Sequence, residues 1–186
     1  MNAKIDIEKE SPISELIEDL GNTNYLTRQR ARLLLVHRNQ EGIPALIKVL
    51  NSHNVNTRWE AVQALGEIRI PETAPVLTEM LMDEDTSVRW AAMESLIRMG
   101  RDSIRPLLEK FVKDFGSLWM REGTHHILRV LKDRHELNDL EITLFEKLDE
   151  QSIPGFESGW NSEQAWAAEQ ALEALDREAI LSSKKL

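Results

Sequence analysis

The sequence repeats a short phrase about every 30 residues, and this repeat restricts the fold more than any other feature. Each phrase starts with an arginine, has a small residue three positions later and has a leucine seven positions later. The arginines are Arg28, Arg58, Arg89 and Arg121, spaced by 30, 31 and 32 residues. The small residues are Ala31, Ala61, Ala92 and Thr124, and the leucines are Leu35, Leu65, Leu96 and Leu128. A fixed period of this length is typical of stacked repeats that bury a continuous core between neighbouring units.

A second apolar pattern precedes each of these runs and predicts a partner helix. In the second unit it consists of Ile43, Leu46, Ile47 and Leu50. This i, i+3, i+4, i+7 spacing puts apolar side chains on one face of a helix. A proline near the start of each pattern favours the first helical turn, at Pro12, Pro44, Pro75 and Pro106. Polar residues between the two runs are suited to a turn and to capping the next helix. Each unit is therefore predicted to be helix, turn, helix.

Two segments carry a family resemblance. Residues 56–66 read Asn-Thr-Arg-Trp-Glu-Ala-Val-Gln-Ala-Leu-Gly, and residues 87–96 read Ser-Val-Arg-Trp-Ala-Ala-Met-Glu-Ser-Leu. Both resemble HEAT repeats of the phycocyanobilin lyase type, and the resemblance extends over four units from residue 12 to about residue 131. The first unit departs from it at Arg32, where alanine or valine is usual. The resemblance implies an all-α fold, a right-handed α-solenoid of about five two-helix repeats whose second helices line the concave side.

We expect residues 1–186 to form a single HEAT-like domain. The predicted units cover residues 12–38, 43–69, 73–99, 104–131 and 137–181. The last unit is degenerate, because Ala165-Trp166-Ala167-Ala168 repeats the phrase Arg89-Trp90-Ala91-Ala92 without the arginine. A longer loop at 151–161 interrupts it. Atypical terminal units are expected in repeat proteins, since they separate the core from water.

Composition restricts the classes of function. The 186 residues carry a formal net charge of −9, which argues against general binding to nucleic acid or to anionic membranes, although a local basic patch could override it. The absence of cysteine excludes disulfides, thiol nucleophiles and cysteine-ligated zinc. The first residues do not fit a signal peptide, and no segment approaches the roughly 20 apolar residues of a membrane span. We therefore expect a cytoplasmic protein.

Tryptophans are the strongest candidates for a binding surface. Trp59, Trp90 and Trp166 share one register, which predicts a column on the concave side of the solenoid. The predicted binding face comprises these tryptophans with Glu60, Gln63, Glu94, Arg98 and His126. Tryptophan is frequent at binding hot spots, and carboxylates beside aromatic rings favour cationic partners. The alternative is that the tryptophans pack between adjacent helices.

The repeat arginines Arg28, Arg58, Arg89 and Arg121 are predicted to be structural. They are placed to pair with turn carboxylates of a neighbouring unit, such as Asp83 or Asp85. The first unit is unusually basic, with Arg28, Arg30, Arg32, His37 and Arg38 on one helix. These side chains could make one end of the groove basic, or they could pair with Glu15, Glu18 and Asp19 on the preceding helix.

Metal binding and catalysis have little support in the sequence. HEAT-type deoxyhypusine hydroxylases bind iron through repeated His-Glu pairs, whereas this chain has one such pair, His135-Glu136. The adjacent His125 and His126 point about 100° apart on a helix and cannot share a metal ion easily. No triad arrangement, phosphate-binding loop or paired acidic motif is present. We predict no metal, no cofactor and no catalytic residue.

Three functions remain as hypotheses. The first is a non-enzymatic scaffold that binds a protein or peptide with cationic or apolar anchors on its concave face. The second follows the resemblance, because such repeats occur in subunits of bilin lyases, and it would make the protein a lyase-like or chromophore-handling subunit. The third is nucleic-acid binding, against which the acidic side chains Glu60, Glu67 and Glu94 argue. The partner and the oligomeric state are left open.

Overall fold

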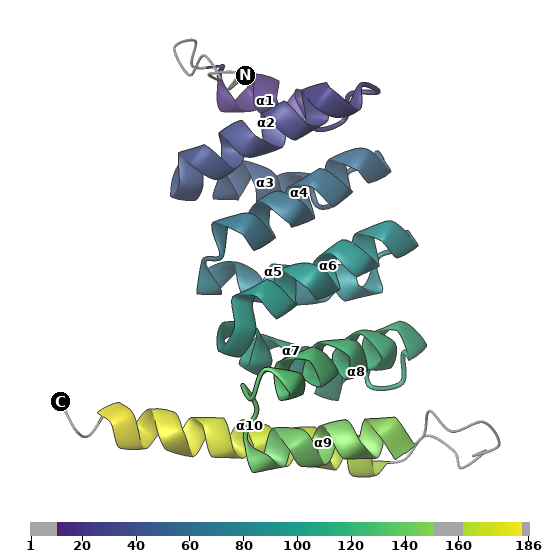
Figure 1. Cartoon of the computed structure of the whole chain (residues 1–186), viewed down its shortest axis with the longest axis vertical. Helices are drawn as coiled ribbons and strands as arrows, with labels where there is room; N and C mark the ends of the chain where they lie inside the picture. Colours follow the sequence, from purple (N-terminus) through teal and green to yellow (C-terminus); the bar gives the residue numbers. More distant parts are fainter. Residues whose placement is uncertain (1–10, 151–161, 184–186) are drawn as a thin grey trace.

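The helices stack one above another along the long axis of the molecule, with α1 and α2 at one end and α9 and α10 at the other (Figure 1). The computed structural model describes residues 11–150 and 162–183; the predicted loop at 151–161 lies outside these residues. The helices are α1 (Ile13–Asp19), α2 (Tyr25–Arg38), α3 (Ile43–Val49), α4 (Val55–Ile68), α5 (Ala74–Glu79), α6 (Thr86–Met99), α7 (Ile104–Asp114), α8 (Leu118–Asp133), α9 (Asp139–Glu150) and α10 (Ser162–Ser183). In these two ranges no strand occurs, and no helix has the length and apolarity needed to cross a bilayer.

Polar side chains begin the second helix of each of the first four pairs. Asn24, Asn54 and Asp85 accept a hydrogen bond from the backbone N–H two residues later, and Ser117 accepts one from Met120. These bonds satisfy backbone donors that a helix leaves unpaired in its first turn. The predicted role of the polar turn residues as caps is confirmed.

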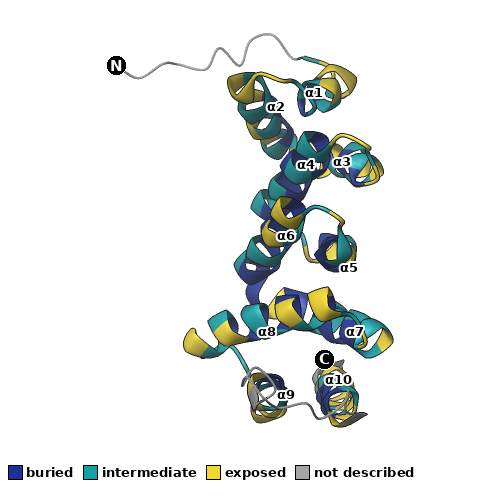
Figure 2. Cartoon of the chain, turned by 90° about the vertical axis from the view of Figure 1, so that its right-hand side faces the viewer, coloured by how far each residue is buried: buried dark blue, intermediate teal, exposed yellow. Residues whose placement is uncertain are grey.

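The helices form two layers, which Figure 2 shows side by side. Helices α2, α4, α6 and α8 pack on one another in what we call the second-helix layer, while α1, α3, α5 and α7 form the first-helix layer. Short 3-10 turns carry the chain from α2, α4 and α6 back to the first-helix layer: η1 (Asn39–Glu41), η2 (Pro71–Thr73) and η4 (Gly100–Ser103). A further one, η3 (Met80–Met82), extends α5. This arrangement is the predicted all-α solenoid.

The core lies between the layers and runs through the stack. The repeat leucines Leu35, Leu65, Leu96 and Leu128 are completely buried, as are Ala61, Ala92 and Thr124, while Ala31 is 1% exposed. The phrase that defines the period is therefore the set of side chains that joins each unit to its neighbours. Burying a leucine removes enough apolar surface from water to contribute about 2 kcal/mol, so these positions dominate the stability of the stack.

The last helix pair exchanges layers, which contradicts the predicted placement of Trp166. Helix α9 packs on α8 and continues the second-helix layer, while α10 packs on α7 and continues the first-helix layer (Figure 2). Trp166 belongs to α10 and therefore lies in the layer opposite to Trp59 and Trp90. The prediction of one column of three tryptophans is wrong.

The connection before α9 gives the physical reason for this exchange. It contains no 3-10 turn. Residues 136–138 have no regular secondary structure, and α9 begins at the next residue. Asn138 accepts hydrogen bonds from the backbone N–H groups of Leu140 and Glu141, and the Glu141 carboxylate accepts one from Asn138. Arg101 donates to the carbonyl of Glu136 at 3.0 Å and to Glu141 at 2.6 Å. This capping box and the arginine together hold α9 beneath α8.

Candidate functional site

Arg58 ties two successive units together. Its guanidinium donates two hydrogen bonds to the Asp83 carboxylate, at 2.8 Å and 2.9 Å, and a third to the carbonyl of Ser52 at 2.8 Å. The side chains of Arg58 and Asp83 are only 7% and 6% exposed. The hydrogen bond to Asp83 raises the pKa of Arg58, although burial opposes this shift. The predicted pairing with a turn carboxylate of the neighbouring unit is confirmed at this position.

Arg28 and Arg89 hold the local backbone. Arg28 donates to the carbonyl of Asn22 at 2.9 Å, and Arg89 donates to the carbonyl of Asp83 at 2.8 Å. Arg121 is half-buried on α8, and burial lowers its pKa. These contacts place the arginines at the turn edge of the stack.

Glu60 differs from its predicted place on an open groove. Its side chain is completely buried between α2 and α4, 3.3 Å from Arg28 and 3.3 Å from Arg32. Arg32 also pairs with Glu67 at 2.9 Å. Burial raises the pKa of the Glu60 carboxyl, and the two arginines oppose this shift. Arg28 and Arg32 of the basic first unit therefore neutralise acids of the second unit, Glu60 and Glu67, rather than the acids of α1.

Trp59 lies in a packed position on α4. It is half-buried against the core, and the Arg32 guanidinium lies over its ring, 5.8 Å from the ring centroid. Beside it, Arg98 of α6 donates to Gln63 of α4 at 2.8 Å. These three predicted surface residues thus contribute to contacts between adjacent second helices.

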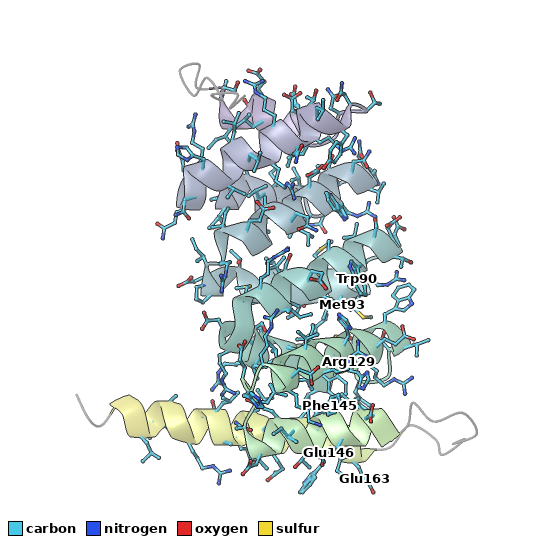
Figure 3. All side chains as sticks on the ribbon, viewed as in Figure 1. Trp90, Met93, Arg129, Phe145, Glu146 and Glu163 are labelled. Carbon is cyan, nitrogen blue, oxygen red and sulfur yellow. The ribbon has the colours of Figure 1, made fainter. Side chains whose placement is uncertain are left out.

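Trp90, in contrast, is open to solvent. Its side chain is 52% exposed, and its ring lies 5.0 Å from the His126 ring of α8. His126 is held between two charged groups, since Arg129 lies 3.1 Å from Nδ1 and Glu94 lies 3.8 Å from Nε2. Because a guanidinium only donates hydrogen bonds, Nδ1 is the unprotonated nitrogen. Trp90 and Arg129 lie along the second-helix layer in Figure 3.

A second exposed tryptophan stands next to this group. Trp119 in the first turn of α8 is 41% exposed, and the preceding Leu118 is 55% exposed. The guanidinium of Arg89 lies 4.3 Å from the centroid of the Trp119 ring, at cation–π distance. Arg89 directly precedes Trp90 in α6, so Trp119 contacts α6 one residue away from Trp90 in the chain. We call Trp90, Leu118 and Trp119 the Trp90–Trp119 patch.

Comparison with known families supports the repeat architecture. Residues 13–97 match the family model for HEAT repeats, and this range covers α1 to α6. This part of the chain is therefore similar to HEAT repeats. Among curated proteins, none matches the chain. The matched range contains three members of the second-helix layer, namely α2, α4 and nearly all of α6.

The helix stack brings together only part of the predicted binding face. Trp90, Glu94 and His126 meet across α6 and α8, as the register indicates. Trp59 lies a unit away in a packed position, and Trp166 lies in the other layer. The binding role of the first three residues stays a prediction.

Sequence reasoning missed Trp119 because of its register. In the HEAT units that contain Trp59 and Trp90, the tryptophan follows the repeat arginine, whereas Trp119 precedes Arg121 by two residues. The available signal was the apolar pair Leu118-Trp119 directly after a capping serine, where the preceding unit has Thr86-Ser87. An apolar pair in an exposed first turn is not needed for helix formation and therefore indicates another role.

The other two histidines considered for metal binding, His125 and His135, lie in separate surroundings. His125 is 3.1 Å from Asp149 of α9 and stacks on Phe145 at 5.2 Å between ring centroids. His135 follows α8 in a left-handed backbone conformation, with φ of 58°. Within the described ranges, no group of three or more metal-type side chains comes together.

The surroundings of His126 give a prediction about its titration. Burial lowers its pKa below the ordinary 6.5, the Arg129 charge lowers it further, and Glu94 raises it. The folded protein thus binds this proton less tightly than the unfolded chain, so stability falls as the pH drops through the ordinary histidine range. We expect Arg129→Ala to raise the pKa of His126 and Glu94→Gln to lower it, as measured by NMR titration of the imidazole Cε1–H. A curve that neither substitution displaces would contradict this placement of His126.

Proposed function

We propose that the protein is an interaction scaffold that binds a partner protein through the Trp90–Trp119 patch. The observation that carries this proposal is the exposure of Trp90 at 52% and of Trp119 at 41% on neighbouring helices of the second-helix layer. HEAT repeats commonly mediate protein interactions, and their stacked helices provide extended binding surfaces.

The two tryptophans are held in place before any partner binds. Trp90 packs against His126, and Trp119 is covered on one face by Arg89. Ordering a side chain at an interface typically costs about 0.5–1.5 kcal/mol, and a residue already held by its neighbours avoids much of that cost. Rigid, amphipathic anchors of this kind supply a large share of binding free energy at protein interfaces.

The surrounding charges indicate the chemistry of the partner. Glu94 lies beside Trp90, and Glu122 is exposed on α8 between the turns of Trp119 and His126. A partner segment with an apolar side chain would cover the rings. A lysine or arginine next to that side chain would pair with the carboxylates and could also lie over a tryptophan face. We therefore propose an apolar anchor flanked by a basic residue.

The experiment compares wild type with Trp90→Ala/Trp119→Ala in capture from native lysate, followed by affinity measurement on the captured protein. Truncating a hot-spot anchor costs about 2–4 kcal/mol, so we expect affinity to fall by about 30-fold or more. Tyr25→Ala is the matched control, because it removes an aromatic ring of similar exposure, 53%, from the first turn of α2, outside the Trp90–Trp119 patch. All three proteins must show the same helical circular dichroism.

Each outcome distinguishes one hypothesis. A partner lost by the double variant and kept by Tyr25→Ala supports the proposal. Equal capture by wild type and the double variant would refute the patch as the binding site. A visible absorption change on adding a bilin would favour the chromophore-handling alternative, and salt-sensitive DNA binding that depends on Arg30 would favour the nucleic-acid alternative.

A further inference from the structure

Trp166 forms part of a separate surface hollow at the C-terminal end of the first-helix layer. The hollow has a volume of about 440 Å³ and is lined by Phe115, Glu163, Ala165, Trp166 and Glu169. Phe115 follows α7, and the other four residues come from the first turns of α10. The exchange of layers creates this hollow, because it brings α10 against α7.

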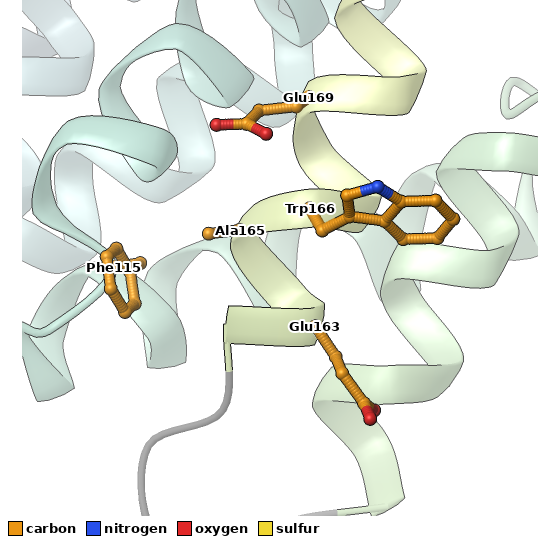
Figure 4. Close-up of a pocket in the computed structure, with 5 residues that line it drawn as sticks. All are labelled: Phe115, Glu163, Ala165, Trp166 and Glu169. Atoms are coloured by element: carbon orange, nitrogen blue, oxygen red, sulfur yellow. The ribbon is translucent and has the colours of Figure 1, made fainter.

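The shape of the hollow follows from one small side chain between two aromatic rings. Figure 4 shows Phe115 and Trp166 on opposite sides of Ala165, with the Glu169 carboxylate toward one end and the Glu163 carboxylate toward the other. Trp166 is 57% exposed and packs away from the buried face of α10, which carries Ala167, Ala168 and Ala171. A larger residue than alanine at position 165 would fill the floor of the hollow.

The charges around the hollow favour a cation. Glu163 already forms an ion pair with Lys147, at 3.4 Å, so the other carboxylate, Glu169, is the one left for a ligand. Among the described residues, Glu169 makes no ion pair, and Glu173 follows it at i+4 on the same side of α10. Like charges at this spacing repel each other by a few tenths of a kcal/mol, so a bound cation would relieve the repulsion. The net charge of −9 would also attract a basic ligand over a longer distance.

We propose that this hollow binds an arginine side chain of a partner protein segment. The guanidinium lies over the Trp166 indole and pairs with the Glu169 carboxylate, while Phe115 contacts the aliphatic part of the side chain. Arginine fits better than lysine because its planar, weakly hydrated head group both stacks on aromatic rings and pairs with a carboxylate through two N–H donors. The site is in the layer opposite to the Trp90–Trp119 patch, and its proposed role does not depend on that patch.

The test uses the whole chain labelled with ¹⁵N, in which the indole N–H signal of Trp166 is assigned by its loss in Trp166→Phe. The probe is the peptide acetyl-Gly-Arg-Gly-amide, and the control probe has citrulline in place of arginine, which keeps the planar head group but removes its charge. We expect arginine to shift the Trp166 signal saturably. The citrulline peptide should bind at least about tenfold more weakly than the arginine peptide, since charge-assisted hydrogen bonds are about twice as strong as neutral ones.

Glu169→Gln tests the charged partner while keeping the Trp166 signal. We expect it to weaken binding of the arginine peptide several-fold, whereas Glu41→Gln, which changes an exposed carboxylate in η1 near the other end of the stack, should leave the affinity unchanged. Equal binding of arginine and citrulline, or equal affinities in Glu169→Gln and wild type, would overturn the proposal. The proposal would also be overturned if the arginine peptide shifted the indole N–H signals of other tryptophans and left the Trp166 signal unchanged. Because the readout is at Trp166, failure here is distinguishable from failure of the Trp90–Trp119 patch.

Discussion

Asp83→Ala is expected to lower the free energy of unfolding by about 3 kcal/mol, because removing one partner of a buried ion pair leaves the other charge buried without its buried counter-ion. The remaining charge would be Arg58, whose side chain is 7% exposed and which would keep its bond to the carbonyl of Ser52 and its contact with Glu84. The measurement is urea unfolding followed by circular dichroism at 222 nm, a wavelength that reports helix content.

Two variants separate this effect from a general loss of surface charge. Glu109→Ala removes a solvent-exposed carboxylate that lies 3.9 Å from Arg105, and we expect it to change stability by less than about 0.5 kcal/mol. The double variant Arg58→Met/Asp83→Ala removes both buried charges and should be more stable than Asp83→Ala alone. If the stability lost by the double variant equalled the sum of the losses in Asp83→Ala and Arg58→Met, the proposed cost of an unpaired charge would be wrong.

Gly66→Ala is expected to destabilise the protein by about 2 kcal/mol, since added atoms in a packed interface force the backbone apart. A Cβ at position 66 would lie 2.2 Å from Oγ, 2.4 Å from Cβ and 3.0 Å from Cα of Ser95, so the contact includes backbone of α6. Ordinary helix propensity works in the opposite direction, because alanine is favoured over glycine in a helix interior by about 1 kcal/mol. We expect the clash with Ser95 to outweigh this gain. Thermal and urea unfolding both measure the net change in stability.

Gly123→Ala is the matched control, as Gly123 is also a helical glycine. Its added Cβ would lie 3.4 Å from the side chain of Leu81, an ordinary contact distance. We therefore expect Gly123→Ala to leave stability unchanged or to raise it slightly through helix propensity. Combining Gly66→Ala with Ser95→Gly should recover part of the lost stability, because the opposing Cβ and Oγ are gone. Equal losses in Gly66→Ala and Gly123→Ala would exclude a close approach of α4 and α6 as the cause.

The predictions from sequence succeeded where a residue's neighbours are set by its own helix or by the next unit. The leucine and alanine registers identified buried positions because a period of 3.6 residues defines one face of a helix. The polar turn residues were recognised as caps because the backbone donors of a first turn need a nearby acceptor. The pairing of Arg58 with Asp83 followed from the repeat, since one period brings each turn beside the next.

The candidate site was predicted less well, because register does not report which surfaces are covered. Trp59 and Trp90 occupy equivalent positions in their units, yet Trp59 is half-buried with Arg32 over its ring while Trp90 is open. Glu60 appeared to be a surface acid, but two arginines from the preceding unit enclose it. Such differences depend on long side chains of another unit, which a periodic pattern does not describe.

The sequence by itself determined the repeat, the helix pairs and the side chains that join them, because these depend on local spacing and on contacts one period away. Only the tertiary structure decided that α9 continues the second-helix layer and that Trp166 lies on the opposite side from Trp90. The phrase around Trp166 is the same as that around Trp90, so the local signal was correct for a helix. Its layer depends instead on the connection at 134–138 and on Arg101, which holds Glu136 and Glu141 and so directs α9 beneath α8.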